Sequence, residues 1–200
     1  ARMSRHAVVQ QPGLLTTVQD LGRVGWRHLG VAHAGALDPD QMRLANRLVG
    51  NPGGAAVLEL TLRGPTLRFD APVRIAITGA TVSARFEGTP VATGRPVELP
   101  AGVLELGAIH HGARAWLAVA GGFDVPSLLG SLSTDLRGGF GGLAGRALGA
   151  GDTIPLGEAP IHVEVTSPRS VAWWIDLHHN VDPRAPIRYR PSEHPLAASL

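Results

Sequence analysis

Polar and apolar residues alternate along much of the chain with the two-residue period of β-strands. In residues 56–62 the side chains of Leu58, Leu60 and Leu62 share one face, and the other face carries Val57, Glu59 and Thr61. Residues 7–10 fit a first strand, and similar patterns predict strands at 66–69, 73–78, 80–86, 91–99, 103–107, 114–120 and 153–156. Glycine and proline separate these segments at the spacing of short strands in a sandwich or barrel. The pattern predicts a mainly β fold.

One helix is expected, over residues 39–49. Asp38 is a good N-cap, Pro39 suits the first helical position, and Gln41 occupies the place of the acceptor in a capping box. Gly50 then ends the helix. The apolar face of this helix consists of Met42, Ala45, Leu48 and Val49.

The end of the chain departs from the strand pattern. Residues 121–151 hold ten glycines and predict an ordered loop or a set of tight turns. The run 138–142 offers successive backbone N–H groups that can form an anion-binding nest beside Arg137, although tight packing alone also explains the glycines. After Gly157 no period persists, so residues 158–200 are interpreted as a linker and the start of an incomplete second half.

Composition excludes several classes of chemistry. The 200 residues are 44% hydrophobic and 17% charged, which is a globular balance, and no apolar run is long enough to span a bilayer. There is no cysteine, so disulfides and thiol nucleophiles are absent, and a cytoplasmic location is expected. All 18 basic residues are arginine, which leaves no Schiff-base lysine and no GxxxxGK[ST] phosphate loop. The arginines are dispersed, which disfavours nucleic-acid binding.

The densest group of polar residues lies before the helix, in residues 13–38. Thr17, Gln19, Asp20 and Arg23 stand there among several glycines, and such a loop can converge on a small ligand. The alternative is a structural loop in which Asp20 and Arg23 pair with each other. We expect this loop and the strand that carries Glu59 to face one common pocket, because a single turn satisfies one or two polar side chains and does not explain Thr17, Gln19 and Asp20 together.

Two further polar residues, Asn46 and Glu59, each have a structural and a functional interpretation. Asn46 lies near the apolar stripe of the helix, where it is either a buried hydrogen-bonding strut or a ligand contact. Glu59 is a surface residue if its face is solvated. If the strand is buried on both sides, Glu59 is paired with an arginine, for which Arg23 is the candidate, or has a raised pKa.

Other catalytic signatures are missing from the sequence. The adjacent pairs His110-His111 and His178-His179 do not have metal-ligand spacing, and no HExxH motif occurs, so we expect no metal site in this chain. No GxSxG motif supports a serine nucleophile.

Two long segments resemble a known family. They are PGLLTTVQDLGRVGWRHLGVAHAGALDPDQMRLANRLVGNPGGAAVLELTLRGPTLRF near the start and AVAGGFDVPSLLGSLSTDLRGGFGGLAGRALGAGD further on. Both are similar to the allophanate hydrolase subunit 2 family, also described as biotin-dependent carboxyltransferase-like proteins, as the C subunit of 5-oxoprolinase and as an antagonist of a kinase inhibitor. The resemblance implies a cyclophilin-like β-barrel over residues 1–157. The QSNRMG-like motif of the family's second half is absent, so we expect an incomplete active site.

The resemblance also implies a function. We expect a non-autonomous subunit of an ATP-dependent amidohydrolase complex that acts on a small lactam or urea-like substrate, with 5-oxoproline converted to glutamate as the first choice. The alternatives are a regulatory protein that sequesters a kinase-inhibitor-like partner and a biotin-dependent carboxyltransferase component.

The same resemblance implies partners and a cofactor, and the polar residues described above form the expected site. The partners are companion subunit 1 (the B subunit of 5-oxoprolinase, kinase-inhibitor-like) and, as a third component, the A subunit of 5-oxoprolinase, which is of the lactam-utilisation type. ATP is expected to be bound mainly by a partner. The expected catalytic residues are Asp20, Arg23 and Glu59, and the expected substrate-binding residues are Thr17, Gln19, Asn46 and Arg137.

Overall fold

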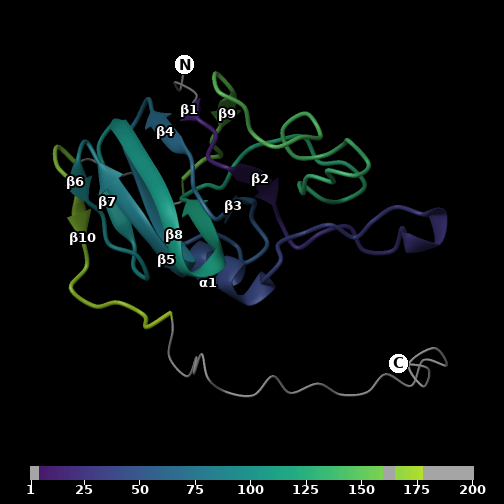
Figure 1. Cartoon of the computed structure of the whole chain (residues 1–200), viewed down its shortest axis with the longest axis horizontal. Coiled ribbons are helices and arrows are strands. Elements are labelled where there is room, and N and C mark those ends of the chain that lie inside the picture. The colour runs from purple at the N-terminus through teal and green to yellow at the C-terminus, as the bar shows by residue number, and fades with distance from the viewer. Residues whose placement is uncertain (1–4, 160–164, 178–200) are drawn as a thin grey trace.

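The computed structural model describes residues 5–159 and 165–177, which contain one bent β-sheet and a single α-helix (Figure 1). The elements, in chain order, are β1 (His6–Gln11), β2 (Leu15–Gln19), the 3₁₀ turn η1 (Arg27–Leu29), α1 (Pro39–Val49), β3 (Val57–Thr61), β4 (Thr66–Phe69), β5 (Val73–Phe86), β6 (Thr89–Pro90), β7 (Val97–Leu99), β8 (Gly102–Val119), β9 (Thr153–Pro155) and β10 (Arg169–Ser170). None of the helices in this part of the chain is long and apolar enough to cross a membrane.

The strands pair in the order β10-β7-β5-β8-β4-β1-β9, with β2 and β3 attached beside β8 and β6 beside β5. The prediction of a mainly β fold with one short helix is confirmed. In the described ranges the two ends of this order do not pair with each other. The sheet is therefore open, and "barrel" describes it only loosely.

Four long segments of the sheet bend at corresponding positions: β1 with β2, β3 with β4, β5 and β8. β1 continues into β2 and β3 into β4, and the register of β2 on β3 is the same as that of β1 on β4. β8 pairs with β4 through its first part, with β3 through its last part, and with β5 on its other edge. Positive φ angles or bulges interrupt all four segments at the bend, at Gly13, Leu62, Gly79 and His111.

The bend changes several predicted strand boundaries. β5 and β8 each run unbroken through positions where the sequence predicts two strands, because bulges at Gly79 and His111 let the ladder continue. The strand predicted at 91–99 is formed only at its end, in β7. Leu62 does not join the inner face with Leu58 and Leu60; β3 ends at Thr61 and the side chain of Leu62 is half exposed.

Gly79 shows why the bend needs a glycine. Its φ is +86°, and a Cβ there would lie 2.6 Å from the ring of Trp116. Its N–H donates to Oε1 of Gln41 at 3.0 Å, so Gln41 ties α1 to the bend. Gln41 therefore does not make the predicted capping-box contact with its own helix.

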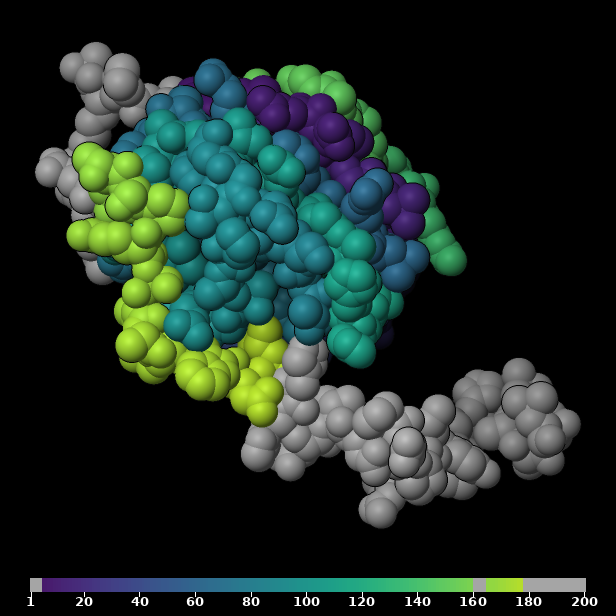
Figure 2. All heavy atoms as spheres, turned by 60° about the vertical axis from the view of Figure 1, so that its left-hand side comes forward, coloured from purple at the N-terminus to yellow at the C-terminus, as the bar shows by residue number. Residues whose placement is uncertain are grey.

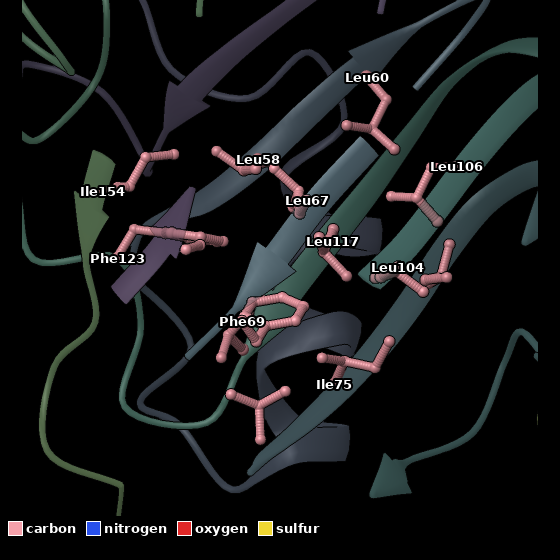
Figure 3. Close-up of a cluster of buried hydrophobic side chains, with 14 of the residues drawn as sticks. Leu58, Leu60, Leu67, Phe69, Ile75, Leu104, Leu106, Leu117, Phe123 and Ile154 are labelled. Carbon is pink, nitrogen blue, oxygen red and sulfur yellow. The ribbon is translucent and has the colours of Figure 1, made fainter. Parts of the chain in front are cut away.

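The core lies inside the bent sheet, and α1 covers part of the outer face. The inward side chains of strands on both sides of the bend meet in one cluster (Figure 3), which includes Leu58, Leu67, Phe69, Ile75, Leu104, Leu117, Phe123 and Ile154. On the outer face Met42, Ala45 and Val49 of α1 pack against Val57, Ala76, Trp116 and Ala118. β3 is therefore buried on both faces.

A buried carboxylate fastens the glycine-rich loop, residues 121–151, to the end of β2. Oδ1 of Asp20 accepts the hydroxyls of Ser131 at 2.7 Å and Ser133 at 2.5 Å, and Oδ2 accepts the N–H of Leu132 at 2.6 Å. The Asp20 N–H donates back to Ser133 Oγ at 2.8 Å. This set of contacts, here named the Asp20 clasp, holds together two segments more than a hundred residues apart.

The pKa of Asp20 reflects the same contacts. Burial penalises the charged form and by itself raises the pKa, but hydrogen bonds from Ser133, Leu132, Ser131 and Gly22 outweigh it and lower the pKa below its usual value. A lowered folded-state pKa contributes stability above the pKa of the unfolded chain. That stability is lost as the pH falls through the folded-state value.

Residues 165–177 lie along the β7 edge of the sheet, shown in yellow-green in Figure 2. β10 pairs with β7, and Glu98 of β7 binds Arg74 and Arg169 at 2.6 Å each. The loop character of residues 121–151 is confirmed, since this range contributes only isolated bridges. The division of the chain at residue 157 stays a prediction.

We expect Asp38→Ala to lower the free energy of unfolding by about 1 kcal/mol, the usual cost of an N-cap. The Asp38 carboxylate accepts the N–H groups of Asp40 at 3.0 Å and Gln41 at 3.1 Å, so its removal leaves both donors unpaired. Urea denaturation measures the change. Asp40→Ala is the control, because it keeps the cap and removes an exposed ion pair with Arg43 and a carboxylate of the first helical turn. Equal midpoints for Asp38→Ala and wild type would contradict the capping role.

We expect Asp20→Asn to cost about 2 kcal/mol or more at pH 7, because several hydrogen bonds to a charged acceptor are weakened or lost. The difference in unfolding free energy between wild type and variant should stay nearly constant from pH 7 to about pH 5 and shrink only as the pH is lowered from about 4 to about 2, because the stability is lost between the unfolded-state pKa and the lowered folded-state pKa of Asp20. Urea midpoints across this range measure it, with the exposed Asp124→Asn as control. A difference that stays constant with pH would show that the charge is not what stabilises the clasp.

Candidate functional site

A pocket of about 230 Å³ opens on the outer face of the sheet, beside the part covered by α1. Its walls are strands β2, β3 and β8, the excursion formed by residues 21–37, and the glycine-rich loop. In Figure 1 the excursion (purple to blue) and the glycine-rich loop (green) extend from the same side of the sheet. The lining residues are Leu15, Thr17, Gln19, Ala32, Ala34, Glu59, Thr61, Arg114, Thr134, Asp135, Leu136 and Arg137.

Strand geometry brings the polar residues of this pocket together. Residues 15–19 form strand β2, where the sequence analysis expects only a loop. Thr17 and Gln19 are therefore turned to one face, and Thr16 and Val18 to the other. Thr17 pairs directly with Glu59 across the β2–β3 ladder, and Thr61 pairs with Arg114 across β3 and β8.

Glu59 is held in a fixed position at the base of the pocket. Its Oε2 accepts the backbone N–H of Leu37 at 2.7 Å and the indole N–H of Trp116 at 3.1 Å. Its Oε1 lies 3.5 Å from Nε of Arg114, and the side chain is only 12% exposed. The strand is buried on both sides and Glu59 pairs with an arginine, as one alternative predicts, but the partner is Arg114 and not Arg23.

Gln19 presents an unsatisfied acceptor. Its amide nitrogen donates to Thr17 Oγ1 at 3.0 Å and to the carbonyl of Thr134 at 3.2 Å, which fixes the orientation of the amide. Its Oε1 is buried and has no hydrogen-bond partner among the described residues, and the residue is 7% exposed. A buried acceptor without a donor costs free energy, so a ligand N–H or a water molecule would be favoured there.

Two guanidinium groups line the pocket, together with the carboxylates of Glu59 and Asp135. Arg114 comes from β8 and is about three-quarters buried, while Arg137 comes from the glycine-rich loop and is exposed. No side-chain partner of Arg137 occurs in the described ranges, and its backbone N–H donates to Oδ1 of Asp135 at 3.1 Å. Guanidinium pairs of this kind bind carboxylates and other small anions.

The anion nest predicted in the glycine-rich run is filled by the protein itself. Oδ1 of Asp135 accepts the N–H groups of Arg137 and Gly138, and the backbone carbonyl of Asp135 accepts those of Gly139 and Phe140. The loop therefore places Arg137 at the pocket through its own turns.

Asp20 and Arg23 lie outside the pocket. Asp20 forms the clasp with the serines and not the predicted pair with Arg23. Arg23 is 1% exposed, stacks 4.7 Å from the centroid of the Phe140 ring and donates from Nη2 to the carbonyl of Ser133. Nε and Nη1 of Arg23 are buried without a hydrogen-bond partner among the described residues, and neither Asp20 nor Arg23 lines the pocket.

Asn46 is also outside the pocket. Its amide donates to the carbonyl of Ala55 at 2.8 Å, and its Oδ1 accepts the amide of Asn51 at 3.0 Å. Asn51 in turn bonds the carbonyl of Val119 and the N–H of Gly121. Of the two alternatives for Asn46, the structure shows the hydrogen-bonding strut.

Sequence reasoning missed Arg114, Thr61 and Thr134 as pocket residues. Their places depend on strand register and on the Asp20 clasp, and no local motif marks them. Thr17, Gln19, Glu59 and Arg137 are the expected residues that the structure brings together. No group of three or more metal-ligating side chains occurs within residues 5–159 and 165–177.

Comparison with known proteins adds independent information. A family model described as carboxyltransferase domain, subdomain A and B, matches residues 29–194. The C subunit of 5-oxoprolinase from Escherichia coli K12 is 49% identical over 148 residues, which cover 74% of this chain and 48% of that protein. The urea amidolyase of Saccharomyces cerevisiae is 43% identical over 145 residues, or 72% of this chain and 8% of that protein.

A solved structure has the same fold. The Kluyveromyces lactis urea carboxylase superposes with a TM-score of 0.76 at 39% identity and covers 84% of this chain and 15% of that one. The chain thus spans about half the length of its 5-oxoprolinase relatives and a small part of the urea-handling enzymes. On the extent of the family match and the shared fold, the chain belongs to the carboxyltransferase domain family, subdomain A and B.

Proposed function

We propose that this chain is one subunit of a multi-subunit enzyme of the 5-oxoprolinase type, and that the pocket beside Glu59 binds its small lactam substrate. The 49% identity to a protein named as the C subunit of 5-oxoprolinase supports the type of complex. The observation that carries the pocket assignment is the buried, unpaired Oε1 of Gln19, a residue that lines the same pocket as Glu59 and two arginines.

The groups of the pocket complement a cyclic amide that carries a carboxylate. Gln19 Oε1 and Glu59 Oε1 offer acceptors for a lactam N–H. Arg137 and Arg114 offer charged donors to the carboxylate or to a carbonyl oxygen on which negative charge develops. The hydroxyl of Thr17 lies between these groups.

In this proposal the subunits of the complex share the steps of lactam opening: this chain binds the substrate and a partner binds ATP. Hydrolysis of 5-oxoproline to glutamate is coupled to ATP in the proposed reaction, and phosphorylation of the amide carbonyl would make it a better acceptor for water. This chain holds and orients the substrate through the pocket. ATP would bind mainly to a partner, since this sequence has no lysine and no GxxxxGK[ST] loop.

The proposed partners are a companion of the same type as the B subunit of 5-oxoprolinase, which is kinase-inhibitor-like, and a third component of the same type as its A subunit. The relatives are named as one lettered subunit of 5-oxoprolinase, which supports the existence of such partners. A cytoplasmic complex is part of the same proposal, and the lack of cysteine is consistent with it.

A second candidate is a carboxyltransferase component that uses carboxybiotin. The description of the matching family model and the identity to urea amidolyases favour it. The two arginines would then hold the carboxyl group under transfer, and Gln19 Oε1 would accept a urea N–H. Biotin would be attached outside these 200 residues, because they contain no lysine.

We expect ATP-dependent release of glutamate from 5-oxoproline by the chain reconstituted with both companions, and no turnover by the chain alone. In the reconstituted complex Arg137→Ala should raise KM about tenfold or more, as expected for loss of a charged contact to substrate. The control is Arg68→Ala on β4, which removes an exposed arginine away from the pocket. Glu59→Gln should lower kcat/KM while an unchanged melting temperature reports an intact fold.

Turnover by the chain alone would contradict the proposed division of labour within the complex. Full activity of both pocket variants would remove the pocket from the proposal. Urea carboxylation in the presence of a biotin carrier, without 5-oxoproline hydrolysis, would select the second candidate. Binding of the companion without any turnover would leave the regulatory alternative.

A further inference from the structure

Exposed aliphatic side chains gather on the two loops that flank the pocket. In the described part of the chain ten large hydrophobic residues are exposed, and five of them lie on these loops. We name this surface the loop face; its apolar residues are Val24, Leu29 and Leu37 of the excursion and Leu128 and Leu136 of the glycine-rich loop. Clustered exposure of this kind marks interaction surfaces more often than scattered single residues do.

The loop face is fastened to the sheet at several points. The indole N–H of Trp26 donates to the carbonyl of Leu129 at 3.1 Å, which links the two loops directly. Within the excursion, backbone bonds join Arg23 to His33 at 2.7 Å and Ala36 to Asp20 at 2.9 Å. The Asp20 clasp fixes the glycine-rich loop beside it. The apolar side chains are therefore displayed on positioned backbone, which lowers the conformational cost of binding.

The loop face and the pocket share residues. Ala32 and Ala34 of the excursion and Leu136 and Arg137 of the glycine-rich loop line the pocket. A molecule that covered the loop face would therefore also cover part of the pocket mouth. Exclusion of water there would strengthen the electrostatic contacts of Glu59 and the arginines with a ligand.

The exposed titratable residues within 21–37 and 134–137 are basic. The excursion contains no acidic residue between Asp20 and Asp38, and its Arg27 and His28 are exposed. Arg137 adds a third exposed basic side chain from the other loop. The complementary surface would carry Asp or Glu around an apolar centre.

These features favour a protein over a lipid surface. Arginine and apolar side chains are typical of protein interfaces, whereas membrane-surface segments are typically amphipathic helices, and residues 21–37 form only a three-residue 3₁₀ turn. The tryptophan of the excursion, Trp26, is partly buried and donates its N–H to the other loop, so it is not displayed as a membrane anchor.

We propose that the loop face is the docking surface for a separate protein chain with an apolar, acidic contact surface, and that docking closes the pocket. The probe for this surface is the kinase-inhibitor-like companion of the proposed complex. The inference rests on the proposed function only for the choice of this partner. Trp173, Trp174 and Ile175 form a second exposed group, beside Arg95 on the β7 edge, but nothing there indicates an occupant.

The test compares two leucines of equal exposure. Leu29 on the loop face is 64% exposed and Leu14 at the bend between β1 and β2 is 65% exposed. Binding of the kinase-inhibitor-like companion is measured by calorimetry, without substrate, for wild type, Leu29→Glu, Leu14→Glu and Arg27→Glu. We expect Leu29→Glu and Arg27→Glu to weaken Kd about tenfold or more, and Leu14→Glu to leave it within about threefold. Circular dichroism confirms that each variant is folded.

Four results would overturn the proposal. They are the absence of companion binding by wild type, equal effects of Leu29→Glu and Leu14→Glu, Leu29-dependent binding to phosphatidylglycerol vesicles without binding to the companion, and Leu29-dependent self-association in light scattering. Because binding is measured without substrate, a failure of 5-oxoproline turnover does not alter these outcomes. Tight companion binding that depends on Leu29, with no turnover, would support the docking surface and count against the proposed reaction.

Discussion

The architecture of the candidate site depends on the buried carboxylate of Asp20. It gathers the hydroxyls of Ser131 and Ser133 and the N–H of Leu132 at the end of β2. Without this clasp, the glycine-rich loop would be held near β2 by backbone bonds such as Thr134 N–H to Val18 and by the side-chain bonds of Gln19, Arg23 and Thr134. The serine contacts set the position of Thr134 and Asp135, and the turns of Asp135 set that of Arg137. A single buried charge, stabilised by hydrogen bonds that outweigh its desolvation, thus positions one wall of the pocket.

The bend in the sheet decides which face can carry a site. Because β3 and β8 wrap around the core with one face, their outer face is free for α1 at one end and for polar chemistry at the other. Trp116 connects these two regions. Its ring packs with Met42 and Ala45 in the cluster under the helix, while its N–H holds Glu59. The catalytic hypothesis for Glu59 therefore involves a carboxylate whose orientation is set by the fold before any ligand binds.

The fold was predictable where the sequence carries clear local signals, such as helix-capping residues or strict alternation of apolar and polar side chains. Asp38, Pro39 and Gly50 delimit α1 as expected, and the alternation around Leu58 and Leu60 marks a true strand. Sequence reasoning failed for β2 because its outward residues are Thr17 and Gln19, which resemble a loop when the strand beside them is unknown. It also failed at the bend. A residue such as Gly79 in the middle of β5 looks in the sequence like the turn that ends a strand, so the sequence predicts two strands where one continues.

The site was predictable only in part, for a related reason. The polarity of Thr17, Gln19 and Glu59 in apolar surroundings is visible in the sequence, and these residues do meet in the pocket. Asp20 and Arg23 are equally polar, but one serves the clasp and the other stacks on Phe140. Arg114 has no distinguishing neighbour in sequence and reaches Glu59 only through the register of β8 on β3. Which polar residues bind ligand is thus decided by long-range pairing.

The most direct measurement of the central claim is an NMR titration of the chain with 5-oxoproline. The indole N–H of Trp116 donates to Glu59 and so reports on the pocket from inside the protein. We expect saturable shifts of that resonance, of the Gln19 side-chain amide and of backbone amides in residues 134–137, with Trp173 and Trp174 unaffected. Shifts confined to other surfaces, or no saturable shift at Trp116 and Gln19, would contradict the assignment of this pocket as the ligand site.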